Sequence, residues 1–78
     1  MELKPLLEAI VRDLVDKPDE VRISEHARET ATVLELRVAR SDIGKVIGKD
    51  GRTAQSIRTV LTAAGSKERR KVHLDIVD

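Results

Sequence analysis

Several kinds of residue are missing or scarce in this chain. Of its 78 residues none is Cys, Phe, Tyr or Trp, and only two are His. Without cysteine there is no disulfide framework, no thiolate nucleophile and no cysteine-ligated zinc site, and two histidines alone make a poor metal site. Without aromatic side chains, the nucleic-acid modules that stack bases on Phe or Tyr are excluded, notably the RRM sheet and the usual OB-fold platform.

Long apolar runs are missing as well. No stretch approaches the roughly 18 apolar residues that a membrane span needs, and an N-terminal segment that carries Glu2, Glu8 and Asp13 does not resemble a signal peptide. With 40% hydrophobic and 37% charged residues, the composition is that of a soluble globular domain. We therefore expect one cytoplasmic domain over residues 1–78, with a thin core because so small a chain buries only about 60% of its unfolded surface.

The first half of the chain contains one helical pattern and two strand patterns. Apolar residues at offsets of one, three and four positions predict an amphipathic helix over 6–15, with Pro5 in its first turn and Pro18 beyond its end. Alternation of apolar and polar residues predicts strands at 21–24 and 34–38. A short connection joins them, so we expect an antiparallel hairpin.

Two helical patterns follow. The first is a short helix over 43–47, with Ser41 as its N-cap and Asp42 near its positive end. The second is a longer helix over 54–64, for which Gly65 is the expected C-cap. Together these helices form a crossover long enough to bring a later strand into the same sheet.

A final alternation at 72–76 predicts the last strand and completes the order α-β-β-α-α-β. This order predicts an α+β fold in which three helices pack on one face of a three-stranded sheet. His26 and His73 are expected at the surface. The basic segment 69–71 is expected either to be a solvated loop or to support a phosphate contact.

The chemically informative segment is 43–53, which reads Ile-Gly-Lys-Val-Ile-Gly-Lys-Asp-Gly-Arg-Thr. Gly48 and Gly51 flank a two-residue tip, and glycines let the chain turn tightly and let another backbone come close. A helix begins directly afterwards, so its free N–H groups and the cations Lys49 and Arg52 face the same space. The segment therefore predicts a small site for an anionic backbone such as a phosphodiester.

Other glycine motifs do not fit the spacing. A Walker A loop has four residues between its glycines and then Lys-Ser/Thr, whereas here three residues separate Gly44 from Gly48 and Asp50 stands in the Ser/Thr position. A dinucleotide fingerprint needs Gly-x-Gly after a strand, and the chain has no such pair. Nucleotide binding of either kind is therefore not expected.

The formal net charge of +1 hides an uneven distribution. Residues 1–39 carry six Lys/Arg and nine Asp/Glu, a balance of −3, and residues 72–78 add −2. Residues 40–71 carry nine Lys/Arg and three Asp/Glu, a balance of +6, and this segment contains the glycine motif. Such asymmetry is typical of a localised site for a polyanion.

The motif from Val46 to Arg52, together with the element order, resembles the type II KH domain. The run from Gly48 to Arg58 is most similar to the small bacterial single-KH proteins of the KhpA family, and the resemblance covers essentially the whole chain. It implies that 48–51 is a GxxG loop that clamps the sugar-phosphate backbone of about four single-stranded nucleotides. The bases would then lie in an aliphatic groove that needs no aromatic platform.

Carried over by position, the resemblance implies ten RNA-binding residues: Ile43, Gly44, Lys45, Val46, Ile47, Gly48, Lys49, Asp50, Gly51 and Arg52. The aliphatic members and Ile57 would lie in the groove or in the core beneath it. Asp50 opposes phosphate, so it is expected to shape the turn by accepting backbone N–H bonds while Lys49 carries the charge.

The function expected is single-stranded RNA binding by a post-transcriptional regulator or RNA chaperone. The resemblance implies self-association, or pairing with a second, larger KH-family RNA-binding protein. Two alternatives stay open: a KH-fold interaction module with part of the stripe Ile57, Val60 and Leu61 as a dimer interface, and a ribosome-associated factor that contacts rRNA. No catalysis, cofactor, metal or small-molecule substrate is expected.

Overall fold

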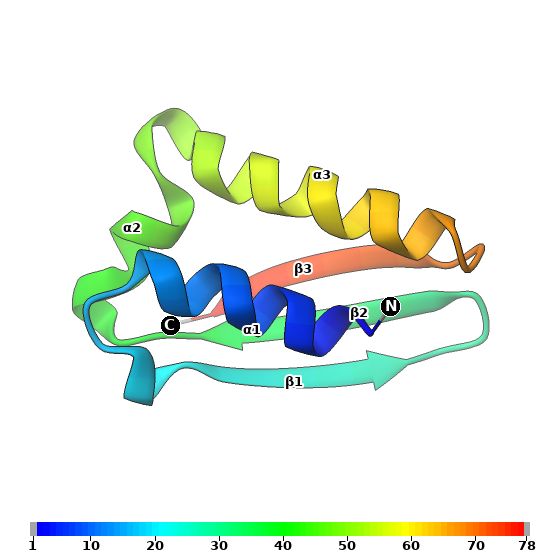
Figure 1. Cartoon of the computed structure of the whole chain (residues 1–78), viewed down its shortest axis with the longest axis horizontal. Coiled ribbons are helices and arrows are strands. Elements are labelled where there is room, and N and C mark those ends of the chain that lie inside the picture. Colours follow the sequence, from blue (N-terminus) through cyan, green and yellow to red (C-terminus); the bar gives the residue numbers. More distant parts are fainter. Residues whose placement is uncertain (1, 78) are drawn as a thin grey trace.

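The computed structural model describes residues 2–77 and contains the six expected elements in the expected order (Figure 1). They are α1 (Leu3–Leu14), β1 (Arg22–Ala27), β2 (Ala31–Arg37), α2 (Ile43–Ile47), α3 (Arg52–Ser66) and β3 (Lys71–Val77). Short 3-10 turns lie at Pro18–Glu20, Arg40–Asp42 and Lys49–Gly51. The predicted α+β class and the α-β-β-α-α-β order are confirmed.

The three strands form one mixed sheet in the order β1-β2-β3. β1 is antiparallel to β2, with Ile23 opposite Leu36, as the short hairpin connection predicts. β3 is parallel to β2, with Leu74 opposite Leu34, because the helices between these strands return the chain to the end at which β2 began. The helices cover one face of the sheet (Figure 1). Because β2 lies in the middle of the sheet, β1 and β3 are its two edge strands.

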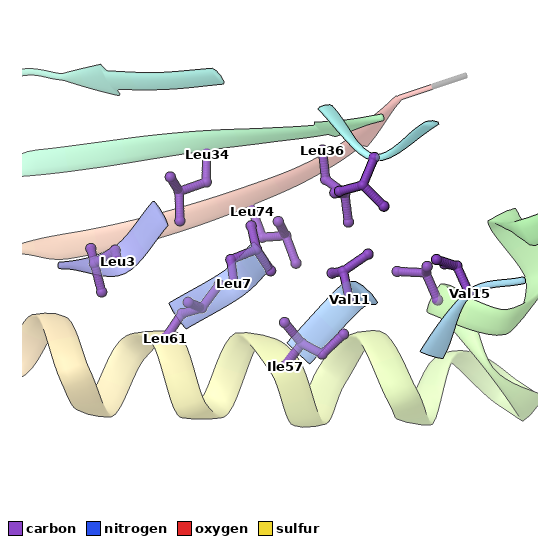
Figure 2. Close-up of a cluster of buried hydrophobic side chains, with 11 residues drawn as sticks. Leu3, Leu7, Val11, Val15, Leu34, Leu36, Ile57, Leu61 and Leu74 are labelled. Atoms are coloured by element: carbon purple, nitrogen blue, oxygen red, sulfur yellow. The ribbon is translucent and has the colours of Figure 1, made fainter. Parts of the chain in front are cut away.

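The core lies between the helices and the covered face of the sheet (Figure 2). Leu7 and Val11 of α1 meet Leu34 and Leu36 of β2, and all four side chains are fully buried. Burial of each such side chain contributes about 1.5–3 kcal/mol. The same layer contains residues of α3 and β3, namely Ile57, Leu61 and Leu74. The core therefore fixes α3 over the sheet and, with it, the turn that precedes α3.

Several element boundaries differ from the predictions; β2, for example, begins at Ala31, earlier than the expected residue 34. α1 begins at Leu3, earlier than the expected start at residue 6, because Leu3 is itself buried and extends the stripe by one turn. β1 continues to Ala27, whereas Val21, expected within it, precedes the strand and packs in the core. In β1 only Ile23 is partly buried, so the alternation there was too weak to define the strand's length.

The expected cap of the short helix is also wrong. Ser41 lies inside the 3-10 turn and makes no side-chain capping bond to α2. Asp42 is buried, and its carboxylate accepts hydrogen bonds from the backbone N–H groups of Asp16 at 3.1 Å and Lys17 at 3.0 Å. The carboxylate therefore ties the α1–β1 connection to the start of α2.

Gly65 does not end α3 as expected. It lies within the helix and is buried, and a Cβ there would collide with a methyl group of Val72 and lie 3.0 Å from the carbonyl oxygen of Arg70. The glycine is needed because α3 passes close to the start of β3. The left-handed residue beyond the helix is Arg69, with φ 58°.

The basic segment 69–71 is only partly solvated. The Arg70 guanidinium donates to Thr32 Oγ1 at 2.8 Å and to the carbonyl oxygens of Arg28 and Ala31 at 2.9 and 2.8 Å. Arg70 therefore holds the β1–β2 hairpin through its Nε and Nη2 donors. His26 and His73 are exposed as predicted, and His26 Nε2 lies 2.7 Å from Glu35 Oε1.

Candidate nucleic-acid interface

The glycine motif forms a tight turn between α2 and α3. Gly48, Asp50 and Gly51 all have positive φ, at 76°, 57° and 73°. The Gly48 N–H donates to the Gly44 carbonyl oxygen at 2.8 Å and ends α2, and the Gly51 N–H donates to the Gly48 carbonyl oxygen at 3.2 Å. The chain therefore reverses within four residues and directs the N-terminus of α3 toward the tip of the turn, as Figure 1 shows.

The two glycines of the tip are needed for different reasons. A Cβ on Gly48 would collide with the side chain of Thr53 and lie 2.9 Å from its backbone nitrogen, in addition to the strain of a positive φ. A Cβ on Gly51 would meet open space, so only its left-handed backbone favours glycine there. The turn is thus packed against α3 on one side and open to solvent on the other.

Two of the three predicted cations are available at the turn. Lys49 and Arg52 are exposed, and within residues 2–77 neither has an ion-pair partner. Lys45 differs because its Nζ lies 3.1 Å from Asp16 Oδ2. Its charge is therefore directed to the α1–β1 connection, away from the tip.

The aliphatic candidates divide between core and surface. Val46 and Ile57 are buried in the core, and Ile43 is partly buried. Ile47 is 38% exposed, one of the large hydrophobic side chains left at the surface. Of the aliphatic side chains that the sequence assigned to groove or core, Ile47 is the one that lines the open groove described next.

An open groove of about 490 Å³ runs from the turn to the edge strand. One wall comes from α2, the turn and α3 through Ile47, Gly51, Ala54 and Arg58, and the other wall is the end of β3, residues 74–77. Ala54, Arg58 and the strand wall were not predicted from the sequence as parts of the site. The alternation over 72–76 predicted a strand, but only the sheet order places that strand beside the turn.

Arg58 crosses the groove. Its Nη2 donates to the carbonyl oxygen of Leu74 at 3.3 Å, which links α3 to the edge strand. A guanidinium has five N–H donors, so those not used by Leu74 can face a ligand in the groove. Arg58 therefore adds a positive charge to the lining of the groove, which also includes the carboxylate of Asp75.

The basic segment 40–71 does not gather at one place. Lys49, Arg52 and Arg58 lie at the turn and in the first half of α3, whereas Lys67 and the segment 69–71 lie at its other end. A helix of 15 residues is about 22 Å long. The expected coincidence of the positive charge with the glycine motif therefore holds for part of the segment only.

The exposed carboxylate of Asp50 is the one anionic group of the tip. It has no hydrogen-bond or ion-pair partner within residues 2–77, so the expectation that it accepts backbone N–H bonds and shapes the turn is not met.

Among residues 2–77 no group of three or more acidic or histidine side chains is placed to hold a metal ion. None of the helices described is long and apolar enough to cross a membrane.

Chemically, the arrangement combines exposed cations, the N-terminus of a helix and a groove whose lining is aliphatic except for Gly51, Arg58 and Asp75. A phosphodiester chain could pass along the turn while apolar faces of its bases enter the groove. A GxxG turn between two helices, in an α-β-β-α-α-β chain whose second and third strands are parallel, defines a type II KH domain.

Comparison with known proteins identifies the family. The chain belongs to the family described as KhpA/KhpB, KH domain, which matches residues 4–76. It is 53% identical over 75 residues to the RNA-binding protein KhpA of Clostridium acetobutylicum, covering 96% of this chain and 100% of that protein. It is 51% identical to the RNA-binding protein KhpA of Halalkalibacterium halodurans (97% and 100% covered) and 46% identical to that of Aquifex aeolicus (97% and 96%).

Proposed function

We propose that this protein binds single-stranded RNA through the GxxG turn and the adjoining groove. The observation that carries the proposal is the turn itself: Lys49 and Arg52 are exposed without an ion-pair partner in residues 2–77, and Gly51 between them lines a groove that reaches the edge strand β3. The relatives' name, RNA-binding protein KhpA, supports RNA as the ligand. Of the ten residues that the sequence suggested, we propose direct contacts with RNA for those of the segment 47–52, while Val46 supports the segment from the core and Lys45 is paired with Asp16.

In this proposal the backbone and the bases of RNA have separate places. Phosphates contact Lys49, Arg52 and the N–H groups at the start of α3, where the helix dipole also favours negative charge. About four nucleotides follow the turn. Their bases rest against Ile47 and Ala54 and reach the edge of β3, within range of Arg58.

This mode of binding suits a general RNA-binding role. Phosphate contacts supply affinity that does not depend on the base sequence of the RNA. A single site for four nucleotides distinguishes few base sequences. A post-transcriptional regulator or an RNA chaperone acting in the cytoplasm fits these properties. The activity we propose is binding, without catalysis.

Charge reversal in the turn tests the proposal. Lys49→Asp and Gly51→Asp place a carboxylate where phosphate would lie, and we expect each to weaken binding of a single-stranded RNA by more than about tenfold. Lys67→Asp makes the same charge change at the far end of α3 and should stay within about threefold of the wild type. Fluorescence anisotropy at fixed salt, with circular dichroism to verify folding, provides the measurement. Wild-type affinity in both turn variants would contradict the clamp.

We further propose that the protein self-associates or pairs with a larger KH-family protein through the outer face of α1 and α3. Ile57 and Leu61 are buried, so of the stripe predicted from the sequence only Val60, 45% exposed, is available. It lines a shallow apolar depression with Ile10 and with Leu14, which is 36% exposed. Exposed apolar side chains of two helices side by side favour a protein contact.

As the first partner we propose a second copy of this chain. Light scattering, which measures the mass of the assembly, tests this contact. Val60→Glu should lower the mass of the wild-type assembly, whereas Thr62→Glu, on the exposed part of the same helix, should not. The assembly should persist between about 50 and 200 mM salt and after nuclease, unlike one held together by RNA. A wild-type protein that is monomeric alone and gains mass only with a larger KH protein would assign the face to that partner.

A further inference from the structure

Asp50 is the anomalous residue of the turn. It is the only acidic residue between Ile43 and Lys67, and it stands between the two cations Lys49 and Arg52. A negative charge in this position repels the phosphates that the turn is proposed to bind. We therefore expect a favourable interaction of Asp50 that would offset this repulsion of phosphate.

The fold does not explain the charge. Asp50 has φ 57° and ψ 25°, a left-handed conformation that Asn and Gly adopt at least as readily as Asp. Its carboxylate is exposed and has no partner in residues 2–77. The backbone thus accounts for a residue of the Asn, Asp or Gly kind but not for an ionised group.

The hydrogen-bond donors of a nucleic-acid backbone limit which of its groups the Asp50 carboxylate can bind. An ionised carboxylate only accepts hydrogen bonds, and phosphate oxygens also only accept them. Within a single-stranded chain, the one hydrogen-bond donor of the sugar-phosphate backbone is the ribose 2′-hydroxyl, which DNA lacks. A carboxylate at a turn that grips the backbone can therefore attract RNA and can only repel DNA.

We propose that Asp50 accepts a hydrogen bond from a ribose 2′-hydroxyl and makes the turn selective for RNA over single-stranded DNA. The inference rests on the proposed RNA clamp and adds to it the discrimination between the two nucleic acids. Lys49 and Arg52, on either side, hold the neighbouring phosphates, so the sugar between two phosphates is the group that Asp50 would meet. In this arrangement the carboxylate reduces total affinity and gains specificity.

Three octanucleotides with identical bases test the inference: oligouridine, its 2′-fluoro form and oligodeoxyuridine. The 2′-fluoro sugar keeps the RNA pucker but has no donor. We expect the wild type to bind oligouridine at least about tenfold more tightly than either other probe, the effect of one hydrogen bond to a charged group. In Asp50→Gly, which tolerates the left-handed backbone, the ratio should fall to near one because binding of the other two probes improves. Asp50→Asn, which keeps an acceptor without the charge, should give an intermediate ratio.

The matched control is Asp13→Asn, which removes an exposed charge from α1 and should leave all ratios unchanged. An unchanged ratio in Asp50→Gly and Asp50→Asn would overturn the inference, as would 2′-fluoro binding equal to that of oligouridine in the wild type. The clamp itself is judged separately, because Gly51→Asp should weaken binding of all three probes. Retained binding in Gly51→Asp refutes the clamp, whereas lost binding there with an unchanged ratio in the Asp50 variants refutes only the role of Asp50.

Discussion

At the scale of single residues, the turn shows how similar glycines serve different purposes. Gly48 is enclosed by Thr53 of α3, Gly51 has a left-handed backbone but open surroundings, and Gly44 lies in α2 with open space around it. The first glycine is therefore required by packing and by backbone conformation. The second is required by conformation alone, and the third by neither.

This difference predicts an order of stabilities for three alanine variants. Gly51→Ala should cost about 1–2 kcal/mol, the strain of a left-handed alanine. Gly48→Ala should cost more, because the new methyl group also displaces Thr53. Gly44→Ala should be neutral or stabilising by up to about 1 kcal/mol, since alanine favours the helix. Urea unfolding measures all three, and equal losses in Gly48→Ala and Gly51→Ala would show that packing against Thr53 is unimportant.

At the scale of elements, α2 is too short to be stable alone, since isolated helices shorter than about 12 residues are marginal in water. Three contacts hold it: the buried Val46, the ion pair of Lys45 with Asp16, and the Asp42 carboxylate bound to backbone N–H groups before β1. The position of the turn therefore depends on a connection that is distant in sequence.

Removal of the Asp42 carboxylate should consequently affect both stability and binding. Asp42→Ala leaves the N–H groups of Asp16 and Lys17 without their acceptor, which costs about 1–3 kcal/mol. We also expect RNA affinity to fall at temperatures where the variant is fully folded, because α2 loses its anchor. Asp42→Asn, which keeps one acceptor oxygen, should recover part of both losses. A stability loss without any change in RNA affinity in the folded variant would contradict the positioning role.

The elements themselves could be predicted from the sequence, but several of their ends could not. Period-3.6 and alternating patterns identified three helices and three strands, most clearly where an element buries one face, as α1, β2 and α3 do. The roles of Ser41 and Gly65 were assigned from local capping preferences and were wrong. Asp42 does stand at the start of α2 as predicted. Its bonds to the amides of residues 16 and 17, and the close approach of Gly65 to the start of β3, depend on distant backbone groups that no local pattern reveals.

The candidate site was predictable on one side only. The turn, Lys49 and Arg52 follow from a continuous stretch of sequence, and the structure brings them together. The groove's second wall, at residues 74–77, depends on the sheet order and on the parallel pairing of β3 with β2. No local pattern in the sequence contains that information.

At the scale of the whole molecule, the two ends of α3 have different tasks. Figure 1 shows the α2–α3 turn at the N-terminal end of α3 and the β1–β2 hairpin toward its other end. The groove adjoins the turn, and Arg70 contacts the hairpin. Net charge is therefore a poor guide to the site. Cations of the same basic segment are divided between ligand binding and support of the fold.

This division predicts that Arg70 affects stability but not RNA binding. Arg70→Ala removes the hydrogen bonds to Thr32 and to two hairpin carbonyls and should cost about 1–3 kcal/mol. RNA affinity of the folded variant should change by less than about threefold, although a positive charge is lost. Thermal unfolding and anisotropy together check this separation. A tenfold loss of affinity in the folded protein would instead place Arg70 on the path of the RNA.

The most direct test of the central claim is an NMR titration of the labelled protein with a short single-stranded RNA. We predict that the amides of residues 47–52 and of the β3 segment 74–77 shift most, since Ile47 and Gly51 of the first segment and the whole of the second line one groove. Amides of the hairpin end should stay unchanged. Shifts concentrated on the uncovered face of the sheet or on the outer face of α1 and α3, with residues 48–51 unaffected, would contradict it.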